Sequence, residues 1–381
     1  MGGVILSALF WGSAFVIFWA YLGYPLALWL ISLVHVKKIA KQDWYPPVTV
    51  IITAYNEGKR IANKIDNTLA LEYPKDKLNI IVVSDASTDR TDEIVRSYTD
   101  RGVKLLRIAE RHGKHYGQGH GIQMASTDIV VLTDATTFLK GDAVAKMVRS
   151  YADPTVGCVS GEDRIEETND GSAGEGAYVK YEMKLRSLEN KVGSLVGASG
   201  CFFSVRKYLC DHWIGDMSSD FYMPIVTRMY GLRAVVEHEA IGYYRVLVNP
   251  DKEFMRKVRT VVHGLEVLFE FKEMLNVFKY GTYTLQMVSH KLCRWLVPFA
   301  MIALLVANPF LLQHGLFYQA LLAGQALLYL MALLGYLLRP LQQVSLFKIP
   351  LFFVMVNLSI LVAWWKYLTG QKYVVWDATK R

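Results

Sequence analysis

Four short acidic motifs lie in order along the middle of this chain, at residues 53–57, 84–89, 133–136 and 218–221. The first three stand at or near the ends of runs of β-branched residues, which are typical of strands. Because ligands of open α/β sheets bind at the carboxyl ends of the strands, these carboxylates can meet in one crevice. The spacing therefore predicts a polar site for a nucleotide, a divalent cation and a catalytic base.

Each aspartate in these motifs has a functional and a structural interpretation. Asp85 directly follows a strand-like run, where a carboxylate can accept hydrogen bonds from a base or a ribose. Asp89 stands just before a predicted helix, so ligand binding and a contribution to helix capping both stay open for it. Asp134 ends a third run and suits Mg²⁺ or Mn²⁺ held partly by substrate phosphates, although turn aspartates are common. Asp220 lies where a helix begins, so it is either a cap or a base.

Basic residues are placed to meet phosphates. Arg256 and Arg259 lie one helical turn apart, so both can face one phosphate, and the planar guanidinium gives paired hydrogen bonds. Lys114 follows Gly113 in a segment with glycines at 117, 119 and 121, where a backbone could approach a diphosphate.

Strand-like and helical segments alternate through the first part of this central region. Strands are predicted at residues 48–53, 78–83, 103–108 and 129–133, with helical stretches between them. Such alternation predicts a parallel sheet with helices on both faces. Beyond about residue 160 the pattern loosens, and helices near 175–192 and 252–270 are the clearest elements.

Both ends of the chain are apolar. Of the 381 residues 52% are hydrophobic, and the mean hydropathy is +0.21. Asp, Glu, Lys and Arg are absent from residues 1–36, 295–338 and 349–365. A bilayer core takes about 20 apolar residues per helix. We therefore predict one long N-terminal helix, two helices split near residues 313–315, and one at about 349–368. A cleaved signal peptide is the alternative for the first stretch.

The net charge is +8, but the basic residues do not form one long run, so nucleic acid is not an expected partner. Lys37, Lys38 and Lys41 follow the first apolar stretch, which by the positive-inside rule places the middle domain in the cytoplasm. Three further spans would then put the basic tail outside, and a re-entrant second span is the open alternative. The four cysteines have no CxxC spacing and are interpreted as reduced thiols.

The helix near residues 252–270 carries a broad apolar face, with basic residues crowding its first turns. A basic amphipathic helix beside membrane spans is typical of the membrane interface. A domain helix with a solvated basic face is the alternative.

Taken in this order and context, the motifs resemble those of membrane-embedded family 2 glycosyltransferases with a GT-A catalytic domain. This group includes cellulose, chitin, hyaluronan and poly-N-acetylglucosamine synthases and ceramide glucosyltransferase. The resemblance covers nearly the whole length and implies an α/β GT-A (Rossmann-like) domain with interface helices, plus α-helical transmembrane segments. The implied division is a transmembrane helix at 1–36, the GT-A domain at 46–250, interface helices at 251–294, about three transmembrane helices at 295–368, and a tail at 369–381.

The resemblance carries over residue by residue on the donor side. Ala54, Tyr55 and Glu57 match the opening nucleotide-site motif, and Asp85 matches the aspartate that contacts the uracil. Lys114, with the glycine before it, matches a Gly-Lys pair that precedes the metal motif. Asp134 takes the place of that metal motif, which implies Mg²⁺ or Mn²⁺ as cofactor.

On the acceptor side, Asp220 takes the place of the family's catalytic base. The segment containing Ser199, Gly200 and Cys201 resembles the one that lines the acceptor site. Arg256 and Arg259 fall on the motif of an interface helix and are counted with the nucleotide-binding residues.

Three departures from the family pattern stand out. Thr136 replaces the second metal aspartate, and Thr260 replaces a tryptophan that stacks near the acceptor in processive members. Residues 115–121 are richer in glycine and histidine than is usual. An Arg-Trp pair does occur further on, at Arg294 and Trp295. These departures leave the metal geometry and processivity open.

The resemblance implies an inverting enzyme that moves a sugar from a UDP-sugar to a growing polysaccharide, with a β-glycosidic product. Transfer of a single sugar to a lipid or lipid-linked acceptor is the alternative, and an inactive GT-A membrane sensor or partner protein is a more distant one. Membrane lipids are expected partners. Four spans are few for a pore, so a homo-oligomer is also considered. The expected location is the plasma (inner) membrane, with the catalytic domain in the cytoplasm.

Overall fold

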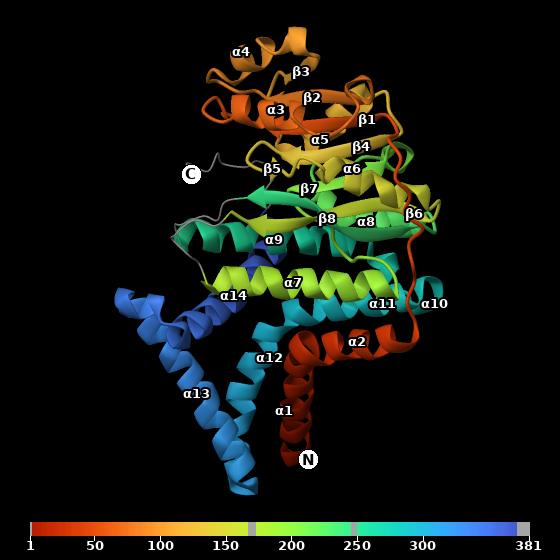
Figure 1. The fold of residues 1–381 in the computed structure, drawn as a ribbon. Helices are drawn as coiled ribbons and strands as arrows, with labels where there is room; N and C mark the ends of the chain where they lie inside the picture. The colour runs from red at the N-terminus through yellow and green to blue at the C-terminus, as the bar shows by residue number, and fades with distance from the viewer. Residues whose placement is uncertain (1, 167–172, 245–249, 372–381) are drawn as a thin grey trace.

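A mixed sheet of eight strands organises the upper part of the molecule (Figure 1). The computed structural model describes residues 2–166, 173–244 and 250–371. The strand order is β3-β2-β1-β4-β7-β6-β8-β5. Its first half is parallel and consists of β1 (Val48–Ala54), β2 (Leu78–Asp85), β3 (Val103–Ile108) and β4 (Ile129–Asp134).

The second half of the sheet lies mostly beyond the alternating region on which the parallel prediction rests, and its strands run in mixed directions. There β7 pairs antiparallel with both β4 and β6, β6 runs parallel to β8, and β5 pairs antiparallel with β8. Antiparallel neighbours need no βαβ crossover, so helix–strand alternation could not reveal them. The bounds are Phe138–Leu139 (β5), Val156–Ile165 (β6), Phe202–Arg206 (β7) and Arg233–Tyr244 (β8).

Helices cover both faces of the parallel half, which explains why its strands are nearly continuous apolar runs. Val50 and Ile52 of β1 belong to one core cluster with Ile61, whereas Ile51 belongs to another with Ile122. The short helices of the domain are α3 (Ile61–Leu69), α4 (Thr91–Arg96), α5 (Lys114–Met124), α6 (Ala143–Val148) and α8 (Ser219–Met229).

Below the sheet, several helices lie across the molecule, and others run downward from them (Figure 1). The crosswise helices are α2 (Tyr24–Val34), α7 (Ala173–Val192), α9 (Pro250–Glu270) and α11 (Thr282–Met287). The descending ones are α1 (Gly2–Phe18), α12 (Cys293–Ala307), α13 (Leu316–Leu337) and α14 (Ser345–Leu368). The apolar face of α9, with Val258 and Val262, packs on Ala363 of α14.

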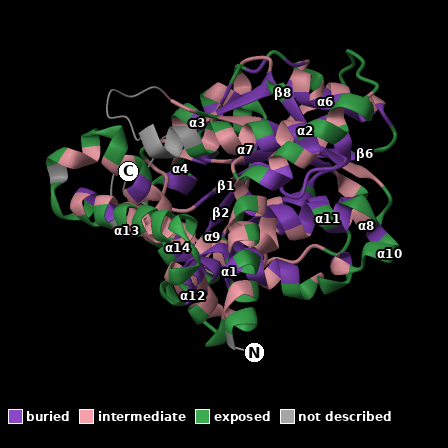
Figure 2. Ribbon diagram, turned by 90° about the horizontal axis from the view of Figure 1, so that it is seen from below, coloured by how far each residue is buried: buried purple, intermediate pink, exposed green. Residues whose placement is uncertain are grey.

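Four helical stretches in the described part of the chain are long and apolar enough to cross a membrane, judged by length and composition. They are Gly3–Val34, Thr282–His314, Leu316–Leu337 and Ser345–Leu368. Seen from below, α13 shows mainly exposed and intermediate residues (Figure 2), and Leu316, Leu330 and Leu337 are among its exposed apolar side chains. Such an exposed apolar surface suits lipid contact.

Two of these stretches contain a π-helical segment, η1 (Trp19–Gly23) in the first and η7 (Val288–Leu292) in the second. The predicted N-terminal helix is therefore not straight: α1 descends, while α2 turns at η1 to run beneath the domain beside α7 (Figure 1). Pro25, in the first turn of α2, has no amide hydrogen to donate. π-bulges and proline are recognised causes of sharp helix bends.

Candidate active site

The loops that follow β1 and β2 are joined by hydrogen bonds. The side-chain oxygen of Asn56 accepts from the Thr88 amide at 2.8 Å, and the Asn56 amide donates to Ser87 Oγ at 3.1 Å. Asn56 and Ala86 both have positive φ, 54° and 56°. Asparagine tolerates this left-handed conformation, but it is strained for alanine. These bonds fix the loop after β1, which follows Ala54 and Tyr55, against the loop after β2.

Asp89 holds the same two loops from the other side. One carboxylate oxygen accepts from the Gly58 amide at 2.9 Å, and the other accepts from the amide of Thr91, at 3.0 Å, and from its hydroxyl. Partial burial raises the pKa of Asp89, but these hydrogen bonds bring it below its ordinary value. The Thr91 hydroxyl accepts in turn from the Glu57 amide at 2.9 Å. Between the two roles left open, the contacts favour capping of α4.

Asp85, at the end of β2, is 5% exposed. Its two oxygens accept hydrogen bonds from the backbone amides of His112, at 2.9 Å, and Gly113, at 2.8 Å. Gly113 has φ 97°, a conformation that other residues rarely adopt. Asp85 therefore fixes the turn that leads into Lys114, and any base or ribose bound here would use its remaining lone pairs.

Arg111 was not singled out from the sequence. Its guanidinium lies 3.8 Å from the centre of the Tyr55 ring, a cation–π contact that places a positive charge beside the predicted nucleotide motif. Nothing in the spacing of the motifs indicates this pairing, because it brings together two loops 56 positions apart.

Lys114 connects three predicted parts of the site. Its Nζ lies 2.5 Å from Asp134 Oδ1 and donates to the Gly200 carbonyl at 2.6 Å. Burial lowers the pKa of Lys114, but the charges of Asp134 and Asp220 raise it above its usual value. Lys114 therefore joins the carboxylate of the predicted metal motif to the acceptor segment.

Asp220 lies in the first turn of α8 and accepts a hydrogen bond from Ser218 Oγ at 2.8 Å. A Cβ placed on Gly200 would lie 3.6 Å from Asp220 Oδ2, so the carboxylate faces the acceptor segment across a glycine. Burial raises the pKa of Asp220, but His115 and Lys114 beside it lower it below its ordinary value. The carboxylate is therefore ionised and able to accept a proton at neutral pH.

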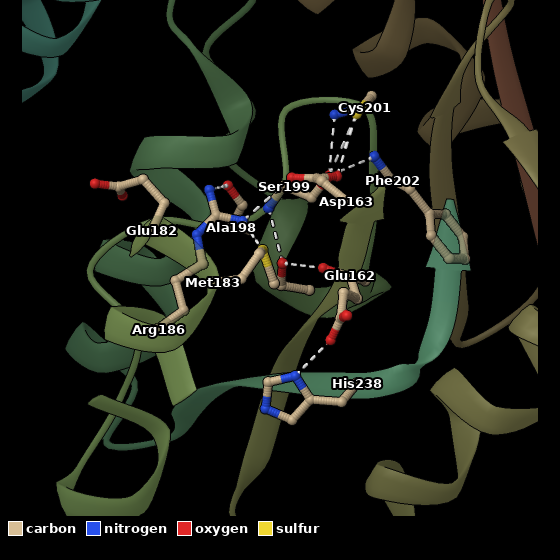
Figure 3. A network of polar contacts seen from close by, with 12 residues as sticks. Glu162, Asp163, Glu182, Met183, Arg186, Ala198, Ser199, Cys201, Phe202 and His238 are labelled. Carbon is tan, nitrogen blue, oxygen red and sulfur yellow. Dashed lines mark hydrogen bonds and ion pairs between the residues drawn. The ribbon is translucent and has the colours of Figure 1, made fainter. Parts of the chain in front are cut away.

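The acceptor segment is held by Asp163 of β6 and Arg186 of α7 (Figure 3). The Ser199 hydroxyl donates to Asp163 and accepts from the amides of Cys201 and Phe202, at 3.2 and 3.0 Å. Cys201 Sγ donates to Asp163 Oδ1 at 3.3 Å. Arg186 pairs with Asp163 at 3.4 Å and donates to the Ala198 carbonyl at 3.1 Å. Neither Asp163 nor Arg186 was found from the sequence, since both lie outside the recognised motifs.

Lys64 of α3 is a second charge that the sequence analysis missed. It is fully buried beneath the end of β4. Its Nζ donates to Thr133 Oγ1 at 3.1 Å and to the Thr137 carbonyl, which flank Asp134. Burial lowers the pKa of Lys64 to about 7, against the opposing effect of Asp134 and Cys201.

The two arginines predicted on the interface helix lie on α9. Arg256 forms a paired contact with Glu253 of the same helix, at 2.6 and 2.7 Å. His263 lies one turn beyond Arg259, on the same face, and its ring centre is 6.3 Å from that of His115. This face of α9 therefore borders the site near Lys114.

Within the described ranges, no group of three or more His, Cys, Asp and Glu residues could hold a metal ion. Asp134 is the carboxylate available at the predicted metal position, and its side chain is 28% exposed. Mg²⁺ is often bound by one or two carboxylates together with substrate phosphates and water. The donor set therefore fits a cation that the nucleotide itself helps to hold.

Comparisons with known proteins agree with this architecture. Residues 49–213 match the sequence family described as "Glycosyl transferase family 2". Poly-beta-1,6-N-acetyl-D-glucosamine synthase of Staphylococcus aureus (strain COL) is 26% identical over 247 residues, 62% of this chain and 60% of the relative. The corresponding synthase of Staphylococcus epidermidis is 24% identical over the same lengths. The chain thus spans about 60% of the length of these relatives.

Among solved structures, a mannosyltransferase of Pyrobaculum calidifontis in complex with GDP-Man and Mn²⁺ is similar in fold. It superposes with a TM-score of 0.72 over 97% of this chain and 99% of that one, at 23% sequence identity. The fold is therefore of the GT-A glycosyltransferase type, as predicted, with a mixed sheet and, among the residues that the structure describes, four helices apolar enough to span a membrane. Residues 49–213 match glycosyltransferase family 2, so the chain contains a domain similar to that family.

Proposed function

We propose that this protein is an inverting glycosyltransferase that moves a sugar from a nucleoside diphosphate sugar to a growing polysaccharide at a membrane. The supporting observation is the convergence at Lys114, which contacts Asp134 and the carbonyl of Gly200 and lies within the electrostatic field of Asp220. The predicted metal ligand, the predicted base and the acceptor segment therefore lie around one lysine. The similarity to poly-beta-1,6-N-acetyl-D-glucosamine synthases supports a polysaccharide product.

Asp220 would act as the base. An acceptor hydroxyl attacks the anomeric carbon, the bond from that carbon to the diphosphate breaks, and Asp220 takes the hydroxyl proton. The nucleoside diphosphate leaves with the electron pair of the broken bond. Attack from the opposite face converts an α-linked donor into a β-linked product.

Lys114 provides fixed positive charge where the leaving diphosphate gains negative charge. Asp134 is the residue that would hold Mg²⁺ or Mn²⁺, and such an ion would add positive charge at the same place. Since Lys114 contacts Asp134 Oδ1, the other carboxylate oxygen would be the ligand of such an ion.

The donor that we propose is a UDP-sugar, bound by the strand-end loops with Ala54, Tyr55, Glu57 and Asp85. The solved structure in complex with GDP-Man makes a GDP-sugar the competing donor. Arg111, stacked on Tyr55, would contact either base, since both present carbonyl oxygens to an arginine donor. We propose the plasma (inner) membrane as the location, with the sheet domain facing the cytoplasm.

Transfer to a lipid-linked acceptor is the second candidate. It is favoured by Lys291 of η7, whose Nζ lies 3.6 Å from the position of a Cβ on Gly197, just before the acceptor segment, where a membrane-borne substrate would arrive. The two candidates share the donor chemistry and differ in product size.

The first experiment is nucleotide release by the purified full-length protein with UDP- and GDP-sugars, with and without Mg²⁺ or Mn²⁺. Asp220→Asn should lower turnover by about 10²- to 10⁴-fold, the usual contribution of a general base, while nucleotide binding is retained. Asp211→Asn, an exposed aspartate nearby, serves as the matched control.

Near-normal turnover of Asp220→Asn would show that Asp220 is not the base. Absence of nucleotide release with every donor would contradict the enzyme proposal and favour a sensor or partner role. Mass spectrometry of the product then separates a polymer from a single addition.

A further inference from the structure

Lys291 lies on η7, where the second candidate membrane stretch joins the crosswise helices. Its neighbours on this helix are anchored: Ser289 accepts a hydrogen bond from Trp19 Nε1 at 2.9 Å, and His290 contacts both Glu189, at 2.7 Å, and Glu182, at 3.2 Å. These contacts fix the rotation of η7. They therefore also fix the direction in which Lys291 leaves the helix.

The Lys291 ammonium points into the candidate acceptor site. Its Nζ lies 5.2 Å from the centre of the Phe221 ring, and Phe221 directly follows Asp220. It also lies 3.6 Å from the position that a Cβ on Gly197 would occupy. Within the described residues Lys291 makes no hydrogen bond and no ion pair; its charge interacts with Glu182 and Glu189 only from beyond contact distance.

The two carboxylates that act on this cation, Glu182 and Glu189, are committed to other partners. Glu182 is paired with Arg294 and contacts His290. Glu189 contacts His290 and accepts a hydrogen bond from the Tyr24 hydroxyl. The acceptor site therefore contains one positive charge that the surrounding protein does not neutralise by direct contact.

An ionisable side chain within a membrane-spanning stretch is costly, and such residues generally serve a function. A lysine near the end of such a helix would ordinarily extend its stem toward water. Lys291 instead extends toward the acceptor segment, from a π-helical segment, and π-bulges occur frequently at functional sites. A second π-helical segment, η1, contacts η7 through the bond from Trp19 to Ser289.

Beside Lys291 the wall of the site is apolar. Trp295 packs edge-on against Phe221 with ring centres 6.2 Å apart, and it fills the space left by Gly264 of α9. Trp364 of α14 donates to the Trp295 carbonyl at 3.0 Å. A cation beside aromatic membrane-helix residues matches a ligand with an anionic head and an apolar chain.

We propose that Lys291 binds a phosphate carried by the acceptor, and that this phosphate is attached to an apolar chain lying against α12 and α14. The inference rests on the proposed function, because it takes Gly197 to Cys201 as the acceptor segment. It deepens the second candidate of that proposal, transfer to a lipid-linked acceptor, by assigning the acceptor to the class of lipid-linked phosphates.

The test uses the full-length protein in detergent micelles without donor. The probes are farnesyl phosphate, farnesol and inorganic phosphate, and the readout is the dissociation constant. Farnesyl phosphate should bind to the wild type, and Lys291→Met should weaken this binding about tenfold or more, the usual effect of losing a charge-assisted contact. Lys291→Arg should restore much of the affinity. Lys272→Met, an exposed lysine after α9, should leave it unchanged.

The three probes distinguish the sources of phosphate. Weak binding of farnesol and of inorganic phosphate supports a lipid phosphate. Lys291-dependent binding of inorganic phosphate as tight as that of farnesyl phosphate would overturn the lipid assignment. Equal affinity of wild type and Lys291→Met for farnesyl phosphate, or no binding to either, would overturn the site itself. Because no donor is present, these outcomes are separate from a failure of nucleotide release.

Discussion

The donor side and the acceptor side of the site are built differently. On the donor side, hydrogen bonds join loops 31 or 32 residues apart, as between Asn56 and Thr88 or Gly58 and Asp89. On the acceptor side, contacts of charged groups join helices more than 100 residues apart, as in Glu189 with His290. The first is a local scaffold of one sheet edge. The second couples the catalytic domain to the helices that can enter a membrane.

This difference predicts different consequences of mutation. Most contacts on the donor side are neutral or involve an amide donor, each worth about 1 kcal/mol, so single losses should be tolerated. The acceptor side depends on buried charges, and removal of one partner leaves the other uncompensated. Variants below the acceptor segment should therefore affect folding and acceptor use together, whereas donor binding should be more robust.

The largest effect that we expect comes from Glu182→Gln. Glu182 of α7 contacts both Arg294 and His290 of the membrane-helix layer. Loss of its charge leaves the Arg294 guanidinium without its carboxylate, and breaking a buried pair in this way costs about 3–5 kcal/mol. The measurement is equilibrium unfolding of the purified protein in detergent.

Lys184→Gln is the matched control, because Lys184 lies on the same helix but is exposed. It should change the free energy of unfolding by less than about 0.5 kcal/mol. If Glu182→Gln changed the free energy of unfolding as little as Lys184→Gln, the catalytic domain would not be coupled to the membrane helices through this ion pair. That result would contradict the contrast between the two sides.

A smaller effect is expected for Asp163→Asn, which weakens the support of the acceptor segment. Asp163 accepts from Ser199 and Cys201 and pairs with Arg186. We expect the acceptor concentration at half-maximal nucleotide release to rise about tenfold or more, with donor affinity unchanged. Glu162→Gln is the control, since Glu162 faces the other side of β6 and contacts His238 (Figure 3). An equal loss of donor affinity would contradict a role confined to the acceptor side.

The same contrast explains how much could be predicted from the sequence. The parallel strands and the strand-end motifs were found because their signals are local: a β-branched run followed by Asp85 or Asp134 is contiguous in the chain. Arg186 and Lys291 could not be assigned in this way. Their importance comes from proximity to residues of other elements, such as Arg186 to Asp163 and Lys291 to Phe221, and a single sequence contains no measure of such proximity.

The bend of the N-terminal helix was missed for a related reason. Residues 1–36 are uniformly apolar, so periodicity does not distinguish the descending α1 from the crosswise α2. Pro25 is a local signal for a break, but the position of α2 depends on contacts with α7, such as Tyr24 with Glu189 at 2.7 Å. The antiparallel half of the sheet was likewise invisible, because strand direction depends on the path of the whole connection.

Lys64 tests the comparison, since it is a fully buried cation on the donor side. Burial lowers the pKa of Lys64 to about 7. In the unfolded chain the pKa of a lysine is about 10.4, as in model peptides. Below about pH 7 the lysine is protonated in both states, and the folded state bears the full cost of burying the charge. Between these two pKa values the unfolded chain binds more protons, so the stability of the folded protein rises with pH.

Lys64→Met should remove this contribution, so the melting temperature of the variant should rise less than that of the wild type between pH 6.5 and 9. Lys59→Met, an exposed lysine just before α3, should keep the wild-type slope. A variant at Lys64 with an unchanged slope would mean that the Thr133 and Thr137 oxygens stabilise the ammonium fully. The donor side would then also contain a buried charge that the protein stabilises fully. The two sides would differ only in how many buried charges they contain.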